Sequence, residues 1–234
     1  MNGSAERIFV ALDLPEPEQA LQVAENLGSR GVGFKVGLEL FMAGGPGLVE
    51  KLAARHPVFL DLKYHDIPNT VAAALRVAAG LGVKMVNLHA SGGSRMMEAA
   101  VEALAGVAKP PLLVAVTVLT SLSGRDLAEI GAGSEPALQV SRLARLASAC
   151  GIDGVVCSPL EIEQVKQETS SRFLTVTPGV RPAGSDSGDQ VRISTPAEVI
   201  RAGGDYLVVG RPVLNTADPL RALDLIIAEM EEAL

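Results

Sequence analysis

The sequence predicts an α/β protein, a single (β/α)8 or TIM barrel that spans residues 1–234 as one domain. Two observations predict this fold. Short β-branched apolar runs alternate with longer Ala- and Leu-rich stretches that carry polar residues at helical spacing, which is typical of repeated βα units. Eight such runs follow one another without a break in composition or a Ser/Pro-rich linker. Eight strands in one unbroken chain favour a closed parallel barrel over an open sheet.

The predicted strands are the apolar runs themselves. The first connection, residues 13–17, lacks the GxGxxG pattern, which removes the main support for a dinucleotide-binding open sheet. The eight predicted strands are residues 8–14, 33–37, 58–63, 85–89, 112–119, 154–158, 173–178 and 206–210.

The predicted helices lie between these strands. Several begin at a Ser, Thr or Asp cap with a Pro nearby, and several end at a Gly. The predicted helices are residues 16–27, 48–54, 70–81, 95–104, 136–149, 161–168, 196–202 and 219–232.

Composition and charge limit the possible partners. The formal net charge of -7 disfavours nucleic acid and anionic membranes as partners, because a negative surface repels both. A small anionic ligand can still be held by local donors at helix starts. Cys150 and Cys157 lack the spacing of a redox or zinc pair and are expected to be buried, inert thiols. No apolar run reaches the roughly 18 residues that span a membrane or resembles a signal peptide, so a cytoplasmic location is expected.

Polar residues gather where the predicted strands end, which is where a barrel of this kind has its active site. One charge at a strand end usually marks only the point where the chain meets water, but repetition on most strands predicts a site. Asp13 and Lys35 interrupt apolar runs, so each should have an opposite charge nearby. In strand order the polar residues are Asp13, Lys35, Asp61 with Lys63, His89, Thr120, Ser158, Arg181 and Arg211.

Asp61 and Lys63 lie two residues apart on one predicted strand, so regular alternation places both side chains toward the barrel axis. With Lys35 and Asp66 they could form an alternating Lys-Asp-Lys-Asp array. In such an array each carboxylate holds an ammonium group charged and in a fixed orientation. A purely structural salt-bridge network is the alternative interpretation of the same residues.

The stretch 177–190 is rich in Gly, Pro and Ser and is too long for an ordinary βα turn. This composition predicts a mobile active-site loop, with a passive surface loop as the alternative. The strand that follows ends at Gly210 and Arg211, and barrels often bind phosphate with the loops after strands seven and eight. Backbone N–H groups near Gly210, the Arg211 guanidinium and the Gln190 amide would suit a phosphate dianion.

Residues 61–70, Asp-Leu-Lys-Tyr-His-Asp-Ile-Pro-Asn-Thr, resemble the DxKxxDIPNT signature of orotidine 5'-monophosphate decarboxylases without a break. Further segments match in the order of that family, at 10–13, 34–37, 87–90, 116–121, 177–181 and 209–212. The resemblance therefore spans almost the whole chain. It implies decarboxylation of orotidine 5'-monophosphate to UMP and CO2, the last step of de novo UMP synthesis, with no metal and no cofactor.

The resemblance also implies a role for each matching residue. Lys63 is the proton donor, and Asp61, Lys35 and Asp66 complete its charged array, with Asp61 also crowding the substrate carboxylate. Asp66, Ile67 and Thr70 reach into the neighbouring subunit's site, which implies a homodimer. The other contacts implied are Asp13 and Lys35 with ribose hydroxyls, Thr120 or Ser121 with the pyrimidine, Gln190, Gly210 and Arg211 with phosphate, and Arg181 with the closing loop.

The chemistry explains why a fixed ammonium is needed. Loss of CO2 from C6 leaves electron density in an sp2 orbital that the ring delocalises poorly, and Lys63 could stabilise this charge and then protonate the carbon. Two alternatives stay open. One is a magnesium-dependent sugar-phosphate decarboxylase or epimerase on the same barrel, because a DxK core could hold a metal. The other is a nucleotide-phosphate-binding barrel that has lost its chemistry.

Overall fold

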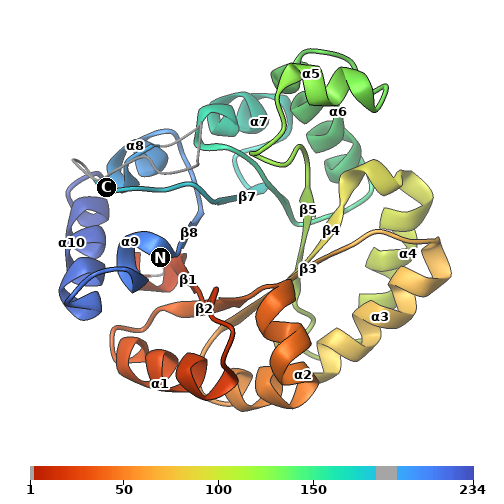
Figure 1. Cartoon of the computed structure of the whole chain (residues 1–234). Coiled ribbons are helices and arrows are strands. Elements are labelled where there is room, and N and C mark those ends of the chain that lie inside the picture. The colour runs from red at the N-terminus through yellow and green to blue at the C-terminus, as the bar shows by residue number, and fades with distance from the viewer. Residues whose placement is uncertain (1–2, 183–193) are drawn as a thin grey trace.

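The computed structural model describes residues 3–182 and 194–234, in which eight parallel strands close into a barrel surrounded by helices (Figure 1). The order around the barrel is the order in the chain, from β1 to β8, and β8 pairs with β1. The predicted (β/α)8 fold is confirmed. The strands are β1 (Ile8–Ala11), β2 (Gly33–Val36), β3 (Val58–Tyr64), β4 (Met85–His89), β5 (Leu112–Val116), β6 (Gly154–Val156), β7 (Leu174–Thr177) and β8 (Tyr206–Val209).

Each predicted strand is present, but six of them are shorter than the apolar run that predicted them, β1 and β5 by the most. β1 ends at Ala11 and β5 ends at Val116. Leu12 and Val118 follow these strands and remain buried. Apolar character therefore continues past the end of the hydrogen-bonded ladder, which is why the sequence pattern overestimated the strand length.

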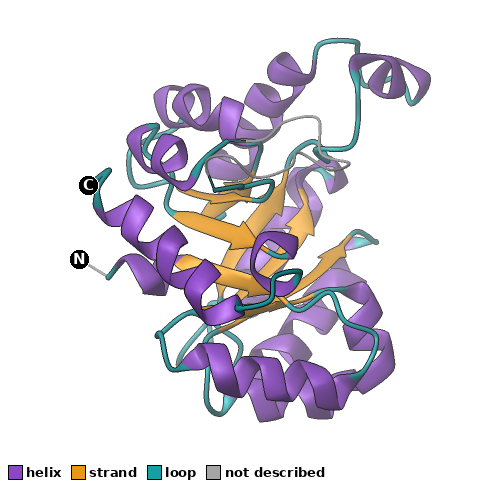
Figure 2. Ribbon diagram, turned by 60° about the vertical axis from the view of Figure 1, so that its left-hand side comes forward, coloured by secondary structure: helices purple, strands orange, loops and turns teal. Residues whose placement is uncertain are grey.

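Helices cover the outside of the barrel (Figure 2). Eight of them correspond to the predicted ones, and the short helices α5 and α9 were not predicted. The helices are α1 (Pro17–Gly28), α2 (Leu38–Ala53), α3 (Pro68–Gly80), α4 (Ser94–Leu104), α5 (Gly124–Glu129), α6 (Pro136–Ala149), α7 (Ile162–Glu168), α8 (Pro196–Arg201), α9 (Arg211–Leu214) and α10 (Pro219–Glu231).

The prediction of a helix confined to residues 48–54 was wrong. α2 begins at Leu38 and contains a kink at Gly45, whose φ of 62° lies in the left-handed region that favours glycine. Pro46 follows this kink and begins the second half of the helix. The run of Gly and Pro at 44–47 interrupts the helical pattern in the sequence, but here it only bends the element.

Apolar side chains form two packing layers that follow the alternation along each strand. One layer fills the barrel, where the rings of Phe9, Phe59 and Tyr206 meet. The other layer lies between the strands and the helices, and includes Phe34 and Leu75. Filling of the lower barrel by large side chains confines any ligand to the mouth at the carboxyl ends of the strands. None of the helices described in the structure is both long enough and apolar enough to cross a membrane.

Candidate active site

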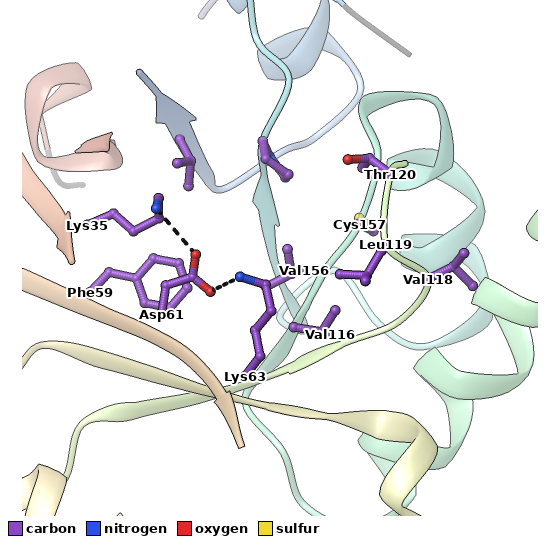
Figure 3. A pocket seen from close by; sticks show the side chains of 12 residues that line it. Lys35, Phe59, Asp61, Lys63, Val116, Val118, Leu119, Thr120, Val156 and Cys157 are labelled. Atoms are coloured by element: carbon purple, nitrogen blue, oxygen red, sulfur yellow. Dashed lines mark hydrogen bonds and ion pairs between the residues drawn. The ribbon is translucent and has the colours of Figure 1, made fainter. Parts of the chain in front are cut away.

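Four charged side chains of alternating sign lie at the mouth of the barrel, and Figure 3 shows three of them, Lys35, Asp61 and Lys63. Lys35 Nζ from β2 lies 3.1 Å from Asp13 Oδ1 and 3.4 Å from Asp61 Oδ2. Lys63 Nζ lies 2.7 Å from Asp61 Oδ1, both on β3. The sequence-based expectation that Asp13 and Lys35 each have an opposite charge nearby is confirmed, since they pair with each other.

Asp66 lies apart from this array within one chain. Its carboxylate is exposed, and its Oδ1 accepts a hydrogen bond from the backbone N–H of Ile67 at 2.6 Å. The end of the array that the sequence pattern assigned to Asp66 is open in the single chain. Asp13 supplies the second carboxylate instead, at the other end, beside Lys35.

Burial strengthens the electrostatics of the array. The side chains of Asp61 and Lys35 are each 11% exposed, whereas that of Lys63 is 31% exposed. Burial alone would raise the pKa of Asp61, but the ammonium groups of Lys35 and Lys63 and hydrogen bonds from Lys63 and Asn87 outweigh it. The pKa of Asp61 therefore lies below its usual value, and its carboxylate stays ionised.

Lys63 has an unusual backbone that the sequence did not reveal. Its φ is 52°, and it is the one residue other than glycine with a positive φ in the described ranges 3–182 and 194–234. Its backbone N–H donates to Asn87 Oδ1 at 2.8 Å, and Asn87 Nδ2 donates to Asp61 Oδ1 at 2.6 Å. Asn87 is fully buried. The signal in the sequence that could have indicated its involvement is an amide in the middle of the apolar strand 85–89.

The charged array borders a cavity of about 190 Å³ at the mouth. Lys35, Asp61 and Lys63 line one side, and Thr120 also reaches it. The remaining wall is mostly apolar, with Val116 and Val156 among its residues (Figure 3). The cavity thus places a fixed ammonium group beside an apolar volume, where its charge is poorly screened by water.

Two residues near this cavity bear on the sequence-based expectations. Ser121, the alternative to Thr120, is exposed and is not among the residues that line the cavity. Cys157 lines the cavity but is buried, and burial raises the pKa of its thiol well above the usual range. The thiol is therefore protonated and weakly nucleophilic, as expected for an inert cysteine.

A second cavity of about 130 Å³ adjoins the first. Its lining includes Asp13, Arg181, Gly210 and Arg211, and it shares Lys35 with the first cavity, together with Pro178 and Val208. Gly210 and Arg211 lie where β8 passes into α9. This basic pocket is at the position where barrels often hold phosphate.

The predicted loop at 177–190 is described only at its start. Val180 forms a bridge with Ser194, and the N–H of Arg181 donates to Ser194 O at 3.0 Å, so residues 180–181 lie beside Ser194. Gln190, the predicted phosphate ligand, lies outside the described residues.

Three of the predicted site residues face outward in the single chain. Asp66, Ile67 and Thr70 are all exposed, and the Ile67 side chain is 67% exposed despite being apolar. They lie at the start of α3, where Ile67 also borders a surface groove of about 450 Å³ together with Arg95 and Met96 of α4.

Both carboxylate oxygens of Asp61, which could serve as metal ligands, already contact ammonium or amide groups. Asp61 Oδ2 faces Lys35, and its Oδ1 accepts from both Lys63 and Asn87. Within residues 3–182 and 194–234, no group of three or more His, Cys, Asp and Glu side chains is arranged to hold a metal ion. Binding of a divalent cation at Asp61 would require displacement of these donors.

A buried carboxylate that holds a lysine ammonium against an apolar cavity, beside a basic pocket at the β7 and β8 loops, defines a barrel enzyme for a phosphate-bearing substrate. The model of the orotidine 5'-phosphate decarboxylase / HUMPS family matches residues 6–226. The chain therefore belongs to this family.

Individual relatives support the same assignment. The chain is 51% identical to the orotidine 5'-phosphate decarboxylase of Saccharophagus degradans over 234 residues, which cover 100% of this chain and 98% of the relative. It is 54% identical to the enzyme of that name from Halorhodospira halophila, with 97% of each chain covered. The crystal structure of orotidine 5'-phosphate decarboxylase from Lactobacillus acidophilus superposes with a TM-score of 0.85 at 39% identity, over 96% of this chain and 99% of that one.

Proposed function

We propose that this chain catalyses the decarboxylation of orotidine 5'-monophosphate to UMP and CO2, the last step of UMP synthesis. The observation that carries this proposal is the Lys63 ammonium, which Asp61 holds at 2.7 Å on the wall of the mouth cavity. The family and the names of relatives at 51% and 54% identity over nearly the whole chain support it.

The reaction needs one bond to break and one proton to move. The bond between C6 and the carboxylate carbon breaks heterolytically, CO2 departs, and the electron pair remains on C6. Lys63 stabilises that negative charge and then transfers a proton from Nζ to C6, which gives UMP. The neutral amine regains a proton from solvent, because its side chain is 31% exposed.

Asp61 and the apolar wall act on the leaving group. The ionised carboxylate of Asp61 lies on the cavity wall, where it would repel the substrate carboxylate. Val116 and Val156 offer that group no hydrogen bond, so they favour neutral CO2 over a carboxylate. Both effects diminish as the negative charge moves from the carboxylate to C6 beside Lys63, which lowers the barrier.

The rest of the substrate is held by the remaining mouth residues. We assign Asp13 and Lys35 to the ribose hydroxyls and Thr120, in preference to Ser121, to the pyrimidine. Gly210 and Arg211 bind the phosphate with Gln190, and Arg181 supports loop closure. The continuity of the two cavities through Lys35 supports this arrangement, because one molecule can occupy both. Phosphate binding then supplies remote binding energy for the chemistry at C6.

The proposed assembly is a homodimer in which Asp66, Ile67 and Thr70 complete the partner's site. Exposure of all three residues in the single chain supports this, since an apolar side chain such as Ile67 gains from burial against a partner. Asp66 from the partner would extend the array to Lys35-Asp61-Lys63-Asp66. We further propose that the chain acts as one domain, without metal or cofactor, in the cytoplasm.

The experiment is a spectrophotometric assay with orotidine 5'-monophosphate after treatment with EDTA. We expect full turnover without added metal, and almost none for Lys63→Ala. Activity that disappears with EDTA and returns with Mg²⁺ would favour the magnesium-dependent sugar-phosphate decarboxylase. Tight binding without CO2 release would indicate a non-catalytic nucleotide-binding barrel.

A further inference from the structure

β3 departs from regular pairing with β4 at the point where it carries the charged array. Leu60 pairs with Val86 and Tyr64 pairs with Leu88, so three residues of β3, 61–63, lie opposite Asn87 alone. Lys63 reaches a φ of 52° within this bulge. A positive φ is unfavourable for a residue with a Cβ, and such backbone persists only where its surroundings impose it.

The Asn87 side chain supplies the contacts that the bulge removes. Its Oδ1 accepts from the Lys63 backbone N–H at 2.8 Å, and its Nδ2 donates to Asp61 Oδ1 at 2.6 Å. Asp61 Oδ1 in turn accepts from Lys63 Nζ at 2.7 Å. The three residues form a closed ring that joins the backbone of Lys63 to its own ammonium group.

A neutral amide is the group that this ring requires. The N–H of Lys63 needs an acceptor and the carboxylate of Asp61 needs a donor, and an asparagine side chain offers both at one position. A leucine of similar size at this fully buried position would leave the Lys63 N–H without its acceptor and would remove the amide donor to Asp61 Oδ1. An aspartate would keep the acceptor but bring a second negative charge against Asp61.

We propose that Asn87 is a positioning residue for the decarboxylation, an inference that rests on the proposed function. It holds the bulged backbone of Lys63 and the carboxylate of Asp61 so that the ammonium points into the cavity. Asn87 itself is not among the residues that line this cavity, so it acts through Asp61 and Lys63 rather than on the substrate.

The first test compares Asn87→Ala with the wild type and with a matched control, Thr175→Val. Thr175 is also fully buried on a strand, but its hydroxyl bonds to Asp205 at the opposite end of the barrel. We expect kcat to fall about 10²-fold in Asn87→Ala, the typical cost of a small misplacement of a reacting group. KM should change less than about threefold, because the ribose and phosphate ligands remain. In Thr175→Val, kcat should be unchanged.

Unchanged kcat in a folded Asn87→Ala would overturn the inference, as would a loss confined to KM. A wild-type enzyme without decarboxylase activity would instead refute the proposed function, so the two failures are distinguishable. If Asn87→Ala fails to fold, Asn87→Asp carries the test, because it preserves the shape of the side chain and the acceptor for the Lys63 N–H.

Asn87→Asp has a readout that a packing role would not produce. The introduced carboxyl can donate to Asp61 only while it is protonated, and repulsion between the two carboxylates raises its pKa. The ratio of its kcat to that of the wild type should therefore fall as pH rises. Asp61, Lys35, Lys63, His65 and His89 are the titrating groups around it, and they are present in both proteins, so the ratio isolates the new carboxyl. A ratio that does not change with pH would contradict the proposal.

Discussion

The two ends of the barrel hold their carboxylates in different ways. At the amino ends of the strands, Asp153 Oδ2 accepts from the Leu113 N–H at 2.8 Å, and Asp205 Oδ2 accepts from the Thr175 N–H at 2.8 Å. At the mouth, Asp61 accepts from the side chains of Lys63 and Asn87 and forms an ion pair with Lys35. Carboxylates of the first kind bond to the backbone of the neighbouring strand, whereas Asp61 holds two lysine ammonium groups at the cavity. We therefore expect residues at the amino ends of the strands, the closed end of the barrel, to contribute to stability, and those at the mouth to contribute to catalysis.

Removal of the mouth ammonium should have the largest effect. We expect Lys63→Ala to lower kcat by about 10⁴-fold or more, because it removes the proposed proton donor and the charge that it would place beside C6. Its free energy of unfolding should change by less than about 1 kcal/mol, since the Lys63 side chain is 31% exposed and Asp61 keeps Lys35 and Asn87 as partners. Steady-state kinetics and urea denaturation measure the two quantities. Lys166→Ala, which removes the ammonium paired with Asp205, is the control and should keep its kcat. Near-normal turnover in Lys63→Ala would remove the basis of the assignment.

The reverse pattern is expected at the closed end. Asp205→Ala should lower the free energy of unfolding by about 3 kcal/mol, because it leaves the Thr175 N–H without this acceptor and the Lys166 ammonium without its carboxylate. The kcat of the folded variant should match that of the wild type. Chemical denaturation with kinetics on the folded fraction tests this. A loss of kcat without a loss of stability in Asp205→Ala would contradict the different roles that we assign to the two ends of the barrel.

Arg211→Ala tests whether substrate binding through the phosphate depends on a different residue of the mouth from the chemistry at C6. We expect Arg211→Ala to raise KM for orotidine 5'-monophosphate by about 30-fold, the value of one charged hydrogen-bonding group. Turnover of orotidine, which lacks the phosphate, should be unaffected. Equal losses on the two substrates would show that Arg211 does not act through the phosphate.

The smallest effect concerns pH and His89, the half-buried last residue of β4. Burial lowers its pKa below the usual value, with further lowering by His65 and Lys63. The unfolded chain therefore takes up a proton before the folded one, so the free energy of unfolding should decrease as pH falls below about 6.5. His89→Gln should reduce this decrease between pH 7 and 5.5, measured as urea midpoints. His56, whose pKa burial also lowers, contributes the same trend in both proteins. An identical decrease in His89→Gln would exclude His89 as its source.

Much of the fold followed from local patterns. Apolar runs and helical spacing predicted all eight strands and the barrel, because each βα unit has a pattern visible within a short window. α5 and α9, with six and four residues, are too short to show a period. α2 was truncated in prediction because local rules treat Gly45 and Pro46 as an end of the helix.

The charged residues of the site could be predicted from the sequence, but the contacts that hold them in place could not. Alternation put Asp61 and Lys63 on one face, and their side chains do meet, yet they do so through a bulge with a left-handed residue. That bulge depends on pairing with β4, which no pattern within β3 reveals. Asn87 was missed for the same reason, since its partners are 24 and 26 residues away in the chain. The pairing of Asp13 with Lys35 likewise depends on β1 lying beside β2.

The seam between β1 and β8 has a consequence for synthesis of the protein. β1 pairs with β2 along one edge. Its other edge stays unpaired until residues 206–209, which form β8, have been synthesised. A ribosome-bound chain that stops earlier carries Lys63 but exposes two unpaired strand edges, which promote aggregation. Gly210 and Arg211 follow the closing strand directly, so the barrel closes and the proposed phosphate site forms at nearly the same point of synthesis. An interrupted chain is therefore a substrate for chaperones and proteases rather than a weak enzyme.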